Sequence, residues 1–251
     1  MRFVFFSVWF LLLSLSVVTG SGQKLYAAGD EITAEIIKTR PLFENRRMPA
    51  IIKLGHETGF PVMQEELEAT HMAPLHVLAI DPGLTDYHHY HPRAMEQTGQ
   101  YIFTITPRTP CTYRVWAAVP AGQGEGRFAT TDLPGAADCS DKPIDRTPNM
   151  TFEDSAYRFQ LDFDTGTLQV GQETAATLTV RSRSGRPIDD LEPVMGAYGH
   201  IDGFYDDYQT VVSIVPEGDA PSSYNDRGGP VLPFHITPAR AGFLDLFARV
   251  R

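Results

Sequence analysis

Five of the eight histidines in this chain of 251 residues fall between positions 71 and 91, in the sequence THMAPLHVLAIDPGLTDYHHYHP. Neutral imidazole is a common ligand for copper, zinc and nickel, so histidines that the fold gathers in one place would form a metal site. A single histidine on a strand is more often a surface or hydrogen-bonded residue, and a His-x-His pair alone is common. The prediction therefore depends on the elements that position these side chains.

The histidine-rich segment is predicted to form a β-hairpin. HVLAI and DYHHYH are strand-like runs, and the intervening DPGLT is typical of a turn. With the turn centred near Gly83, His76 lies opposite His91, and alternation along the strand places His89 on the same face. Opposed side chains have Cβ atoms about 5 Å apart, so three imidazoles on this face can reach one ion.

The predicted metal site has three core ligands and two further candidates. The face that carries the three histidines also carries Leu78, Ile80 and Tyr87, and we expect it to be the core side of the domain. The loop before the first strand can add a fourth ligand, where an imidazole favours Cu(II) or zinc and a thioether favours Cu(I). We expect copper, with zinc as the alternative. The predicted ligands are His76, His89, His91, His71 and Met72, whereas His88 is expected to point the other way into solvent.

The N-terminus has the pattern of an export signal. MRFVFFSVWFLLLSLSVVTGSGQ has one early charge, an apolar run and then small residues. We assign residues 1–28 to a signal peptide and a short mature N-terminus, with cleavage near Gly20 to Gly22 or after Ala27 or Ala28. A retained anchor is the alternative, although the run is shorter than the roughly 20 residues that span a bilayer. We expect a periplasmic or secreted protein without stable membrane insertion after processing.

Two cysteines, Cys111 and Cys139, are present in a chain that is predicted to enter an oxidising compartment. A disulfide between them is therefore expected, and it would contribute roughly 3 to 4 kcal/mol by restricting the unfolded chain. The alternative is that one thiolate is a copper ligand. The bridge would tie the first domain to the segment that follows it.

The chain matches itself in three ungapped blocks that occur in the same order. The matches include Gly59 with Gly185, His76 with His200, and a repeated ITP motif. In the second copy Ser213 stands where the first has His89, so that copy is expected to lack the metal site. The blocks are 31–62 over 157–188, 71–92 over 195–216, and 101–119 over 232–250.

The repeated unit is predicted to be a β-sandwich. Short alternating strands, 19 prolines and 21 glycines, and scarcely any helical periodicity favour an all-β protein with two tandem immunoglobulin-like domains that arose by internal duplication. We expect the first domain at 29–125, a loop-like linker at 126–150, and the second domain at 151–251.

Composition and motifs exclude several classes of function. A net charge of −10 argues against binding to nucleic acid or to anionic membranes, which need clustered basic residues. No GxSxG, HExxH or phosphate-binding glycine loop is present, and Asp86 falls on the strand face opposite His89 and His91, which disfavours a two-histidine, one-carboxylate iron site. We therefore do not expect an enzyme.

The first repeat contains a Gly-x-Pro-Val strand end, a histidine followed by apolar residues, an acidic turn, and an aromatic-x-His-x-His-Pro sequence. In this combination it resembles exported bacterial proteins with YtkA-like or related copper-handling β-sandwich domains. It implies periplasmic metal binding or accessory work for a metal system, without catalysis. A metal-free module that supports a membrane transporter or an oxidase assembly partner is the alternative function. The matching residues are Gly59, Pro61, Val62, His76, Val77, Leu78, Asp81, Asp86, Tyr87, His89, His91 and Pro92.

Overall fold

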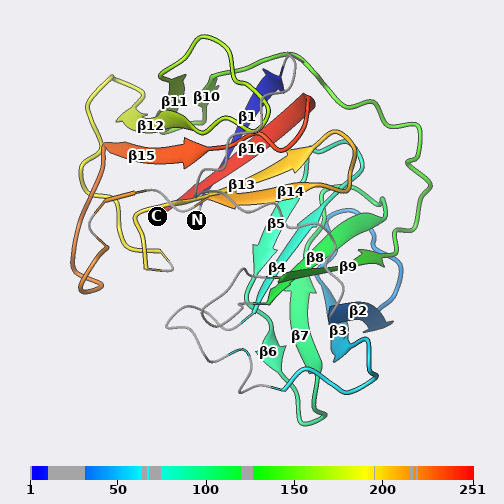
Figure 1. Ribbon diagram of the computed structural model, residues 1–251. Coiled ribbons are helices and arrows are strands. Elements are labelled where there is room, and N and C mark those ends of the chain that lie inside the picture. The colour runs from blue at the N-terminus through cyan, green and yellow to red at the C-terminus, as the bar shows by residue number, and fades with distance from the viewer. Residues whose placement is uncertain are drawn as a thin grey trace. The chain divides into compact units, whose positions relative to one another are not determined.

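The computed structural model describes residues 2–10, 32–63, 67, 75–119, 127–194, 196–214, 217–218 and 220–251. The chain divides into two units, Tyr26–Asp145 and Arg146–Arg251, and the second also includes the N-terminal strand β1 (Arg2–Phe10). We call them domain 1 and domain 2. Both are built from β-strands (Figure 1).

Domain 1 is a sandwich of two antiparallel sheets, with strand orders β2-β3-β7-β6 and β5-β4-β8-β9. This corresponds to the two-sheet arrangement of immunoglobulin-like sandwiches. The prediction of an all-β fold with tandem β-sandwich domains is confirmed. The strands of the first sheet are β2 (Ile32–Lys38), β3 (Met48–His56), β6 (Arg93–Ala94) and β7 (Gln100–Ile105), and those of the second are β4 (His76–Ile80), β5 (Tyr87–Tyr90), β8 (Tyr113–Val119) and β9 (Arg127–Leu133).

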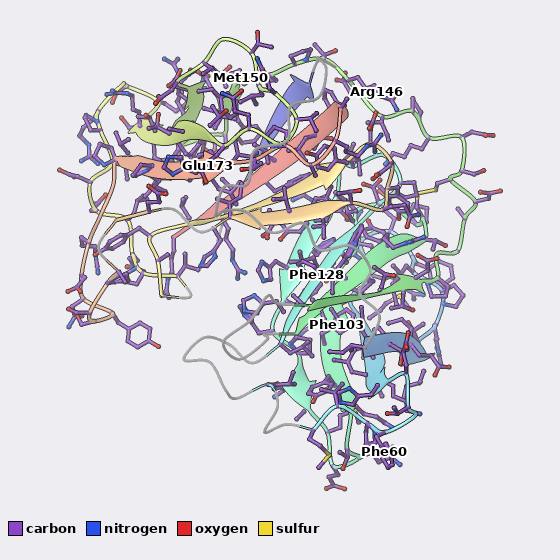
Figure 2. The ribbon with its side chains drawn as sticks, viewed as in Figure 1. Phe60, Phe103, Phe128, Arg146, Met150 and Glu173 are labelled. Carbon is purple, nitrogen blue, oxygen red and sulfur yellow. A yellow bond between two sulfur atoms is a disulfide. The ribbon has the colours of Figure 1, made fainter. Side chains whose placement is uncertain are left out.

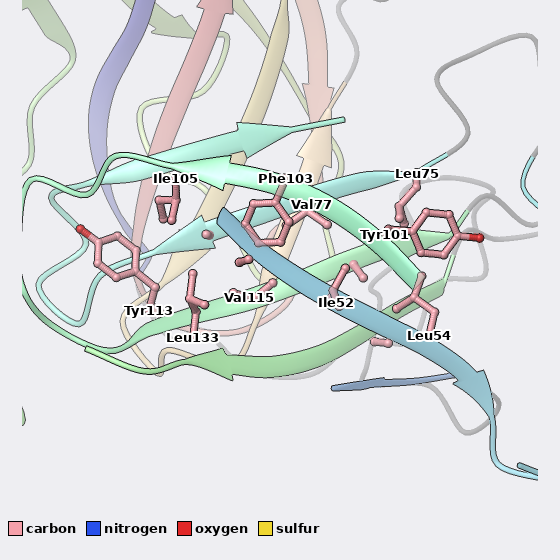
Figure 3. Close-up of a cluster of buried hydrophobic side chains, with 14 of the residues drawn as sticks. Ile52, Leu54, Leu75, Val77, Tyr101, Phe103, Ile105, Tyr113, Val115 and Leu133 are labelled. Carbon is pink, nitrogen blue, oxygen red and sulfur yellow. The ribbon is translucent and has the colours of Figure 1, made fainter. Parts of the chain in front are cut away.

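Alternation along the strands directs one row of side chains from each sheet into the core of domain 1 (Figure 3). Ile52 and Phe103 enter it from the first sheet, and Val77 and Val115 from the second. Some apolar side chains outside this core are exposed at turns. Phe60, just after β3, is 72% exposed, whereas Phe103 in the core is 5% exposed. Figure 2 labels both residues.

Domain 2 has the same plan, with sheets β10-β11-β12-β15 and β14-β13-β16-β1. Its core contains Phe159, Leu178 and Phe234 from the first sheet and Ile201 and Leu246 from the second. The remaining strands are β10 (Thr151–Glu153), β11 (Tyr157–Phe163), β12 (Thr174–Ser182), β13 (His200–Tyr205), β14 (Val211–Ile214), β15 (Val231–Ile236) and β16 (Gly242–Val250).

The internal repeat is visible in the positions of the strands. β3 begins at Met48 and β12 at Thr174, and these residues are aligned in the sequence comparison of the two copies. β4 and β13 likewise begin at the aligned residues His76 and His200. The duplicated sequence blocks therefore fold into equivalent strands.

Paired glycines mark the same turn in both domains. Gly59 has a φ of 86° and Gly185 a φ of 90°, a left-handed conformation that glycine adopts without steric cost. An isolated antiparallel bridge closes each turn, from Gly55 to Pro61 and from Arg181 to Pro187. Identical residues at these positions thus reflect one backbone geometry that the turn requires.

The predicted linker at 126–150 is wrong in its first part. Arg127–Leu133 forms β9, which pairs with β8 along its whole length. Domain 1 extends to Asp145. The many Pro, Gly and Asp residues that follow β9 dominate the composition of this segment, so composition alone predicts a loop where a short alternating strand lies.

The N-terminal segment pairs with domain 2. β1 lies antiparallel to β16, from Arg2 opposite Val250 to Phe10 opposite Gly242. The expected cleavage positions near Gly20 and Ala27 lie outside the described residues, and the signal peptide stays a prediction. In the part of the chain that the structure describes, no helix has the length and apolar character needed to cross a membrane.

Candidate metal centre

The histidine hairpin forms with the predicted register. β4 and β5 pair antiparallel, with Val77 opposite Tyr90 and Leu78 opposite His89. The turn residue Leu84 has a φ of 55°. Because register fixes which side chains share a face, this pairing places His76 and His89 on one side of the hairpin and Tyr90 on the other.

Three imidazoles converge at the open end of this hairpin. One ring nitrogen each from His76, His89 and His91 lies within 4.8 Å of the others, and Nδ1 of His76 is 2.8 Å from Nε2 of His89. Metal–nitrogen bonds of about 2.0 to 2.1 Å in tetrahedral geometry place ligand nitrogens about 3.3 Å apart, so side-chain adjustments of about 1 to 2 Å would complete a three-histidine site. The rings lie 4.8 to 5.3 Å apart between centroids.

The three candidate ligands differ in exposure. His89 is buried at 8% exposure, His76 is half-buried and His91 is exposed. The apolar side chains of Leu78 and Trp116, opposite one another in β4 and β8, lie on the same sheet face and are buried. The site therefore has an enclosed side at His89 and an accessible side at His91, an arrangement that admits an ion from solvent.

The predicted face of the hairpin is wrong. Val77, Ala79 and Tyr90 contact the domain 1 core, so the histidines occupy the opposite face of the sheet, outside that core. Tyr90 stacks on Phe103 at 5.2 Å between ring centroids. HVLAI is apolar at every position after its histidine, and alternation cannot identify the core side of a strand that is buried on both faces.

The two further candidate ligands are not placed. His71 and Met72 lie outside the described residues, so their predicted role as a fourth ligand stays a prediction. Within the described part of the chain, the cluster that could hold an ion consists of histidines alone. Asp86 is on the opposite face, as expected, and the iron-site alternative gains no support.

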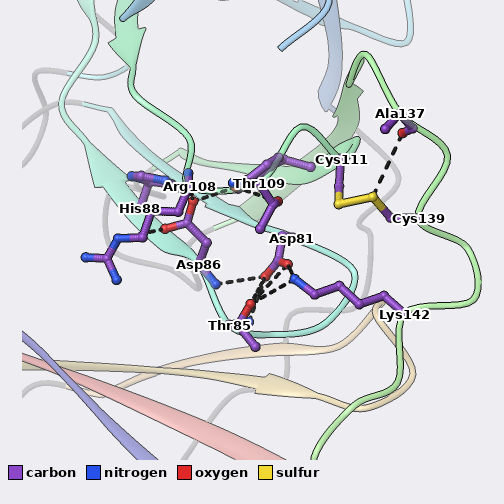
Figure 4. A network of polar contacts seen from close by, with 11 residues as sticks. Asp81, Thr85, Asp86, His88, Arg108, Thr109, Cys111, Ala137, Cys139 and Lys142 are labelled. Carbon is purple, nitrogen blue, oxygen red and sulfur yellow. Dashed lines mark hydrogen bonds and ion pairs between the residues drawn. A yellow bond between two sulfur atoms is a disulfide. The ribbon is translucent and has the colours of Figure 1, made fainter. Parts of the chain in front are cut away.

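The hairpin turn is held by the carboxylate of Asp81, which is fully buried (Figure 4). It accepts hydrogen bonds from the backbone N–H groups of Thr85 and Asp86, at 2.7 and 2.8 Å, and from the Thr85 hydroxyl. Nζ of Lys142 forms an ion pair with the same carboxylate and donates to the Thr85 hydroxyl at 3.0 Å. A buried carboxylate satisfied in this way fixes the turn that joins the two histidine strands.

A second buried carboxylate, Asp86, anchors the start of β5. It accepts hydrogen bonds from the Tyr113 hydroxyl at 2.5 Å, from the Arg108 backbone N–H at 2.6 Å, and from His88 at 3.0 Å. Burial alone would raise the pKa of the Asp86 carboxyl, but the hydrogen bonds and charge of His88, with those from Tyr113 and Arg108, lower it overall. Burial and the same contact raise the pKa of Tyr113, which keeps its hydroxyl a donor.

His88 is therefore neither a ligand nor a solvated bystander. Its side chain is 15% exposed and bonded to Asp86, and it stacks on Tyr90 at 5.7 Å between centroids. The expectation that it points away from the metal site is confirmed, whereas its predicted exposure to solvent is wrong. It positions β5 from the side opposite His89.

The predicted disulfide between Cys111 and Cys139 is present. It holds the segment after β9 against the loop between β7 and β8, and Lys142 lies three residues beyond it, with its N–H bonded to the Cys139 carbonyl at 3.1 Å. Gly135 makes this approach possible, since a Cβ there would lie 2.0 Å from the carbonyl carbon of Cys111. The disulfide thus presents Lys142 to Asp81, and neither cysteine is available to bind copper.

Domain 2 keeps one of the three histidines. His200 begins β13 as His76 begins β4, and it is 4% exposed. Its Nε2 lies 3.1 Å from the Val194 carbonyl oxygen, where it acts as donor. Ser213 follows in β14 at the position that corresponds to His89. The described residues of domain 2 include no group of three side chains that could hold a metal ion, and the absence of a site in this domain stays a prediction.

Both repeats of this chain match one known protein family. The family model described as "Domain of unknown function (DUF8832)" matches residues 43–134 and again residues 151–251. The chain belongs to this family. Each match falls on one repeat, and the description assigns the family no activity.

Comparisons with other proteins add no functional information. No curated protein matches this sequence. Among solved structures, the chain is similar to the Escherichia coli adhesin FdeC, with 14% identity, 91% of this chain and 61% of that chain covered, and a TM-score of 0.25. It is also similar to trypsin-activated alpha-2-macroglobulin from Escherichia coli, with 11% identity, 88% and 13% covered, and a TM-score of 0.26. The chain spans less than two thirds of the length of either protein.

Proposed function

We propose that this protein is an exported metal-binding accessory protein that holds one ion, with copper the expected metal and zinc the alternative, on the hairpin of domain 1. The observation that carries the proposal is the convergence of His76, His89 and His91, with donor nitrogens within 4.8 Å of one another. Three imidazoles on one hairpin face are unnecessary for a metal-free module but sufficient for the inner coordination of Cu or Zn.

The surroundings of the hairpin support a preorganised site. Buried Asp81 fixes the turn, and buried Asp86 fixes β5 on the side away from the ligands. A site whose supporting side chains are already hydrogen-bonded loses little conformational entropy when the ion binds. Such rigidity favours retention of an ion over a transient surface contact.

Copper is preferred over zinc because of the resemblance of the first repeat to copper-handling sandwich domains, which includes His76 and the sequence from Tyr87 to Pro92. Imidazole ligands alone accept both metals. Export is supported by the signal-like sequence of the N-terminus. The accessible side at His91 suits delivery of the ion to, or receipt from, a transporter or an oxidase assembly protein.

The test is titration of the purified protein with Cu(I), Cu(II) and Zn(II), beside a variant that carries His76→Ala, His89→Ala and His91→Ala. We expect at least a tenfold loss of copper affinity in the triple variant, because imidazole supplies all the donors of the described cluster. A control variant with His56→Ala and His235→Ala should bind like the parent chain, since neither residue belongs to the cluster.

Affinity should also fall below about pH 6, because a proton competes with the metal for an imidazole whose reference pKa is about 6.5. Circular dichroism of the metal-free variants establishes that all of them are folded. Equal affinity of the parent chain and the triple variant would contradict the proposed metal site. The metal-free interaction module would then be the better-supported function.

A further inference from the structure

The two domains complete their second sheets with strands from different parts of the chain. In domain 1 the order is β5-β4-β8-β9, and β9 follows β8 directly in sequence. In domain 2 the equivalent strands are β14, β13 and β16, and β1 from the N-terminus takes the fourth position. The outer edge of β16 is therefore covered by Arg2–Phe10, the segment with signal-peptide character.

The outer edge of β16 requires a covering strand. β16 has nine residues, and all but Gly242 are buried. Leu244, Leu246, Ala248 and Val250 belong to the core of domain 2. A long apolar edge without a partner presents unpaired backbone N–H and C=O groups and invites pairing with another chain. The fold of domain 2 thus depends on an added strand here.

The register defines what such a strand must contain. Positions 4, 6 and 8 of β1 pair with Ala248, Leu246 and Leu244, which belong to the core of domain 2, so a strand at this edge needs apolar residues at these alternate positions. In RFVFFSVWF these positions are Val, Phe and Val. Backbone pairing supplies affinity in strand addition, and alternate apolar side chains supply specificity.

We propose that the outer edge of β16 is a strand-accepting site, which Arg2–Phe10 fills in the uncleaved chain and an extended segment of a partner protein fills after processing. This rests on the export proposed above. The partner segment is about nine residues long, runs antiparallel to β16 and carries large apolar residues at alternate positions. A second copy of this chain fits less well, because the core-facing side chains of its own β16 are already packed in its own domain.

The experiment compares hydrogen exchange in the full chain with exchange in a chain whose residues 2–10 are replaced by a Gly/Ser sequence of equal length. We expect at least tenfold faster exchange of β16 amides in the replaced chain.

A synthetic peptide of sequence RFVFFSVWF with added terminal lysines should restore protection. The same peptide with Phe6→Pro should not, since proline interrupts the backbone ladder. Trp116 is the only tryptophan left in the replaced chain, and its fluorescence reports on domain 1.

Three results would overturn the proposal if domain 2 of the replaced chain folds. The first is unchanged protection of β16 in a replaced chain that is monomeric. The second is protection that accompanies a doubled mass in sedimentation, which would assign the edge to a second copy. The third is an exported chain whose intact mass still includes Arg2–Phe10, because no partner strand is then needed.

If domain 2 fails to fold without residues 2–10, the peptide present during refolding should restore the folded domain. Failure of the peptide to do so also counts against the site. Metal titration of the replaced chain tests the histidine centre independently.

Discussion

Asp86 shows how a single residue supports the site without touching it. Its carboxylate is 2% exposed and accepts hydrogen bonds from Tyr113, Arg108 and His88 on the core side of β5. The candidate ligand His89 lies three residues later, within β5, and faces the other way. The carboxylate therefore fixes the strand from behind, and its charge is compensated within domain 1.

Replacement of Asp86 by asparagine should lower the free energy of unfolding of domain 1 by about 2 to 4 kcal/mol at neutral pH, since a buried hydrogen-bonded charge is lost. The pKa of Asp86 is lowered in the folded protein, so its stabilising contribution is present above the unfolded reference value of about 3.9 and is lost as pH falls through the folded value. Urea unfolding at pH 7 and near pH 3 should show a difference between the two proteins that shrinks at the lower pH.

The matched control for this substitution is Asp132→Asn. Asp132 pairs with Arg114 at 2.7 Å, and its side chain is 51% exposed. An exposed ion pair contributes about 0 to 1 kcal/mol. An equal loss of stability in the two variants would contradict the structural role assigned to Asp86.

At the scale of elements, the hairpin is held by a segment that lies far away in sequence. We call the ion pair of Lys142 with Asp81, together with the Cys111–Cys139 disulfide, the brace. Lys142 reaches Asp81 in the β4–β5 turn because the Cys111–Cys139 disulfide holds the chain after β9 in place. The brace acts on the end of the hairpin opposite the three histidines. We therefore expect it to affect the three histidines through the rigidity of two short strands.

Lys142→Met should weaken metal binding by about two- to tenfold, a smaller loss than the removal of ligands, because outer groups orient a site and do not coordinate the ion. The same titration used for the histidine variant measures it. Lys53→Met is the control, since Lys53 is exposed on β3 in the other sheet. Equal affinity of the Lys142 variant and the parent chain would show that the brace serves stability alone.

The sequence predicted the hairpin well and its surroundings poorly. Register and the common face of His76, His89 and His91 followed from period-two alternation and the position of the turn. The core side did not follow, because both faces of β4 are apolar and buried. The ion pair of Lys142 with Asp81 spans 61 residues, and no local pattern connects two residues so distant. The Pro, Gly and Asp content of residues 126–150 hid the strand β9. By contrast, comparison of the two repeats located most of the strands that both domains contain.

At the scale of the whole molecule, the same family domain occurs twice, and the two copies differ in their histidines and in the strand that completes the second sheet. Both repeats match the same family model and form β-sandwiches. Domain 1 carries the histidine cluster and closes its sheet with β9, while domain 2 keeps only His200 of that set and closes its sheet with β1. The two repeats thus comprise a candidate metal domain and a domain whose second sheet includes a strand from the N-terminus.

Saturating metal should therefore protect domain 1 alone. A ligand at about 100 times its Kd stabilises the folded state by about 2.7 kcal/mol, and the effect belongs to the unit that binds it. Hydrogen exchange followed by mass spectrometry should show slower exchange in β4 and β5 and unchanged exchange in β12 and β15. The triple histidine variant is the control and should not respond in either domain. Comparable protection of domain 2 would contradict a site confined to the first repeat.

The graded exposure of the three histidines would have a kinetic consequence for a bound ion. His89 is buried, His76 half-buried and His91 exposed, so an incoming ligand would approach an ion held by these residues most readily from the His91 side. Exchange from that side would be associative, with an acceptor bound before His91 is released and His89 released last. The rate of transfer would then rise with acceptor concentration while spontaneous dissociation stayed slow, so an ion could be held firmly and still be passed quickly to a suitable acceptor.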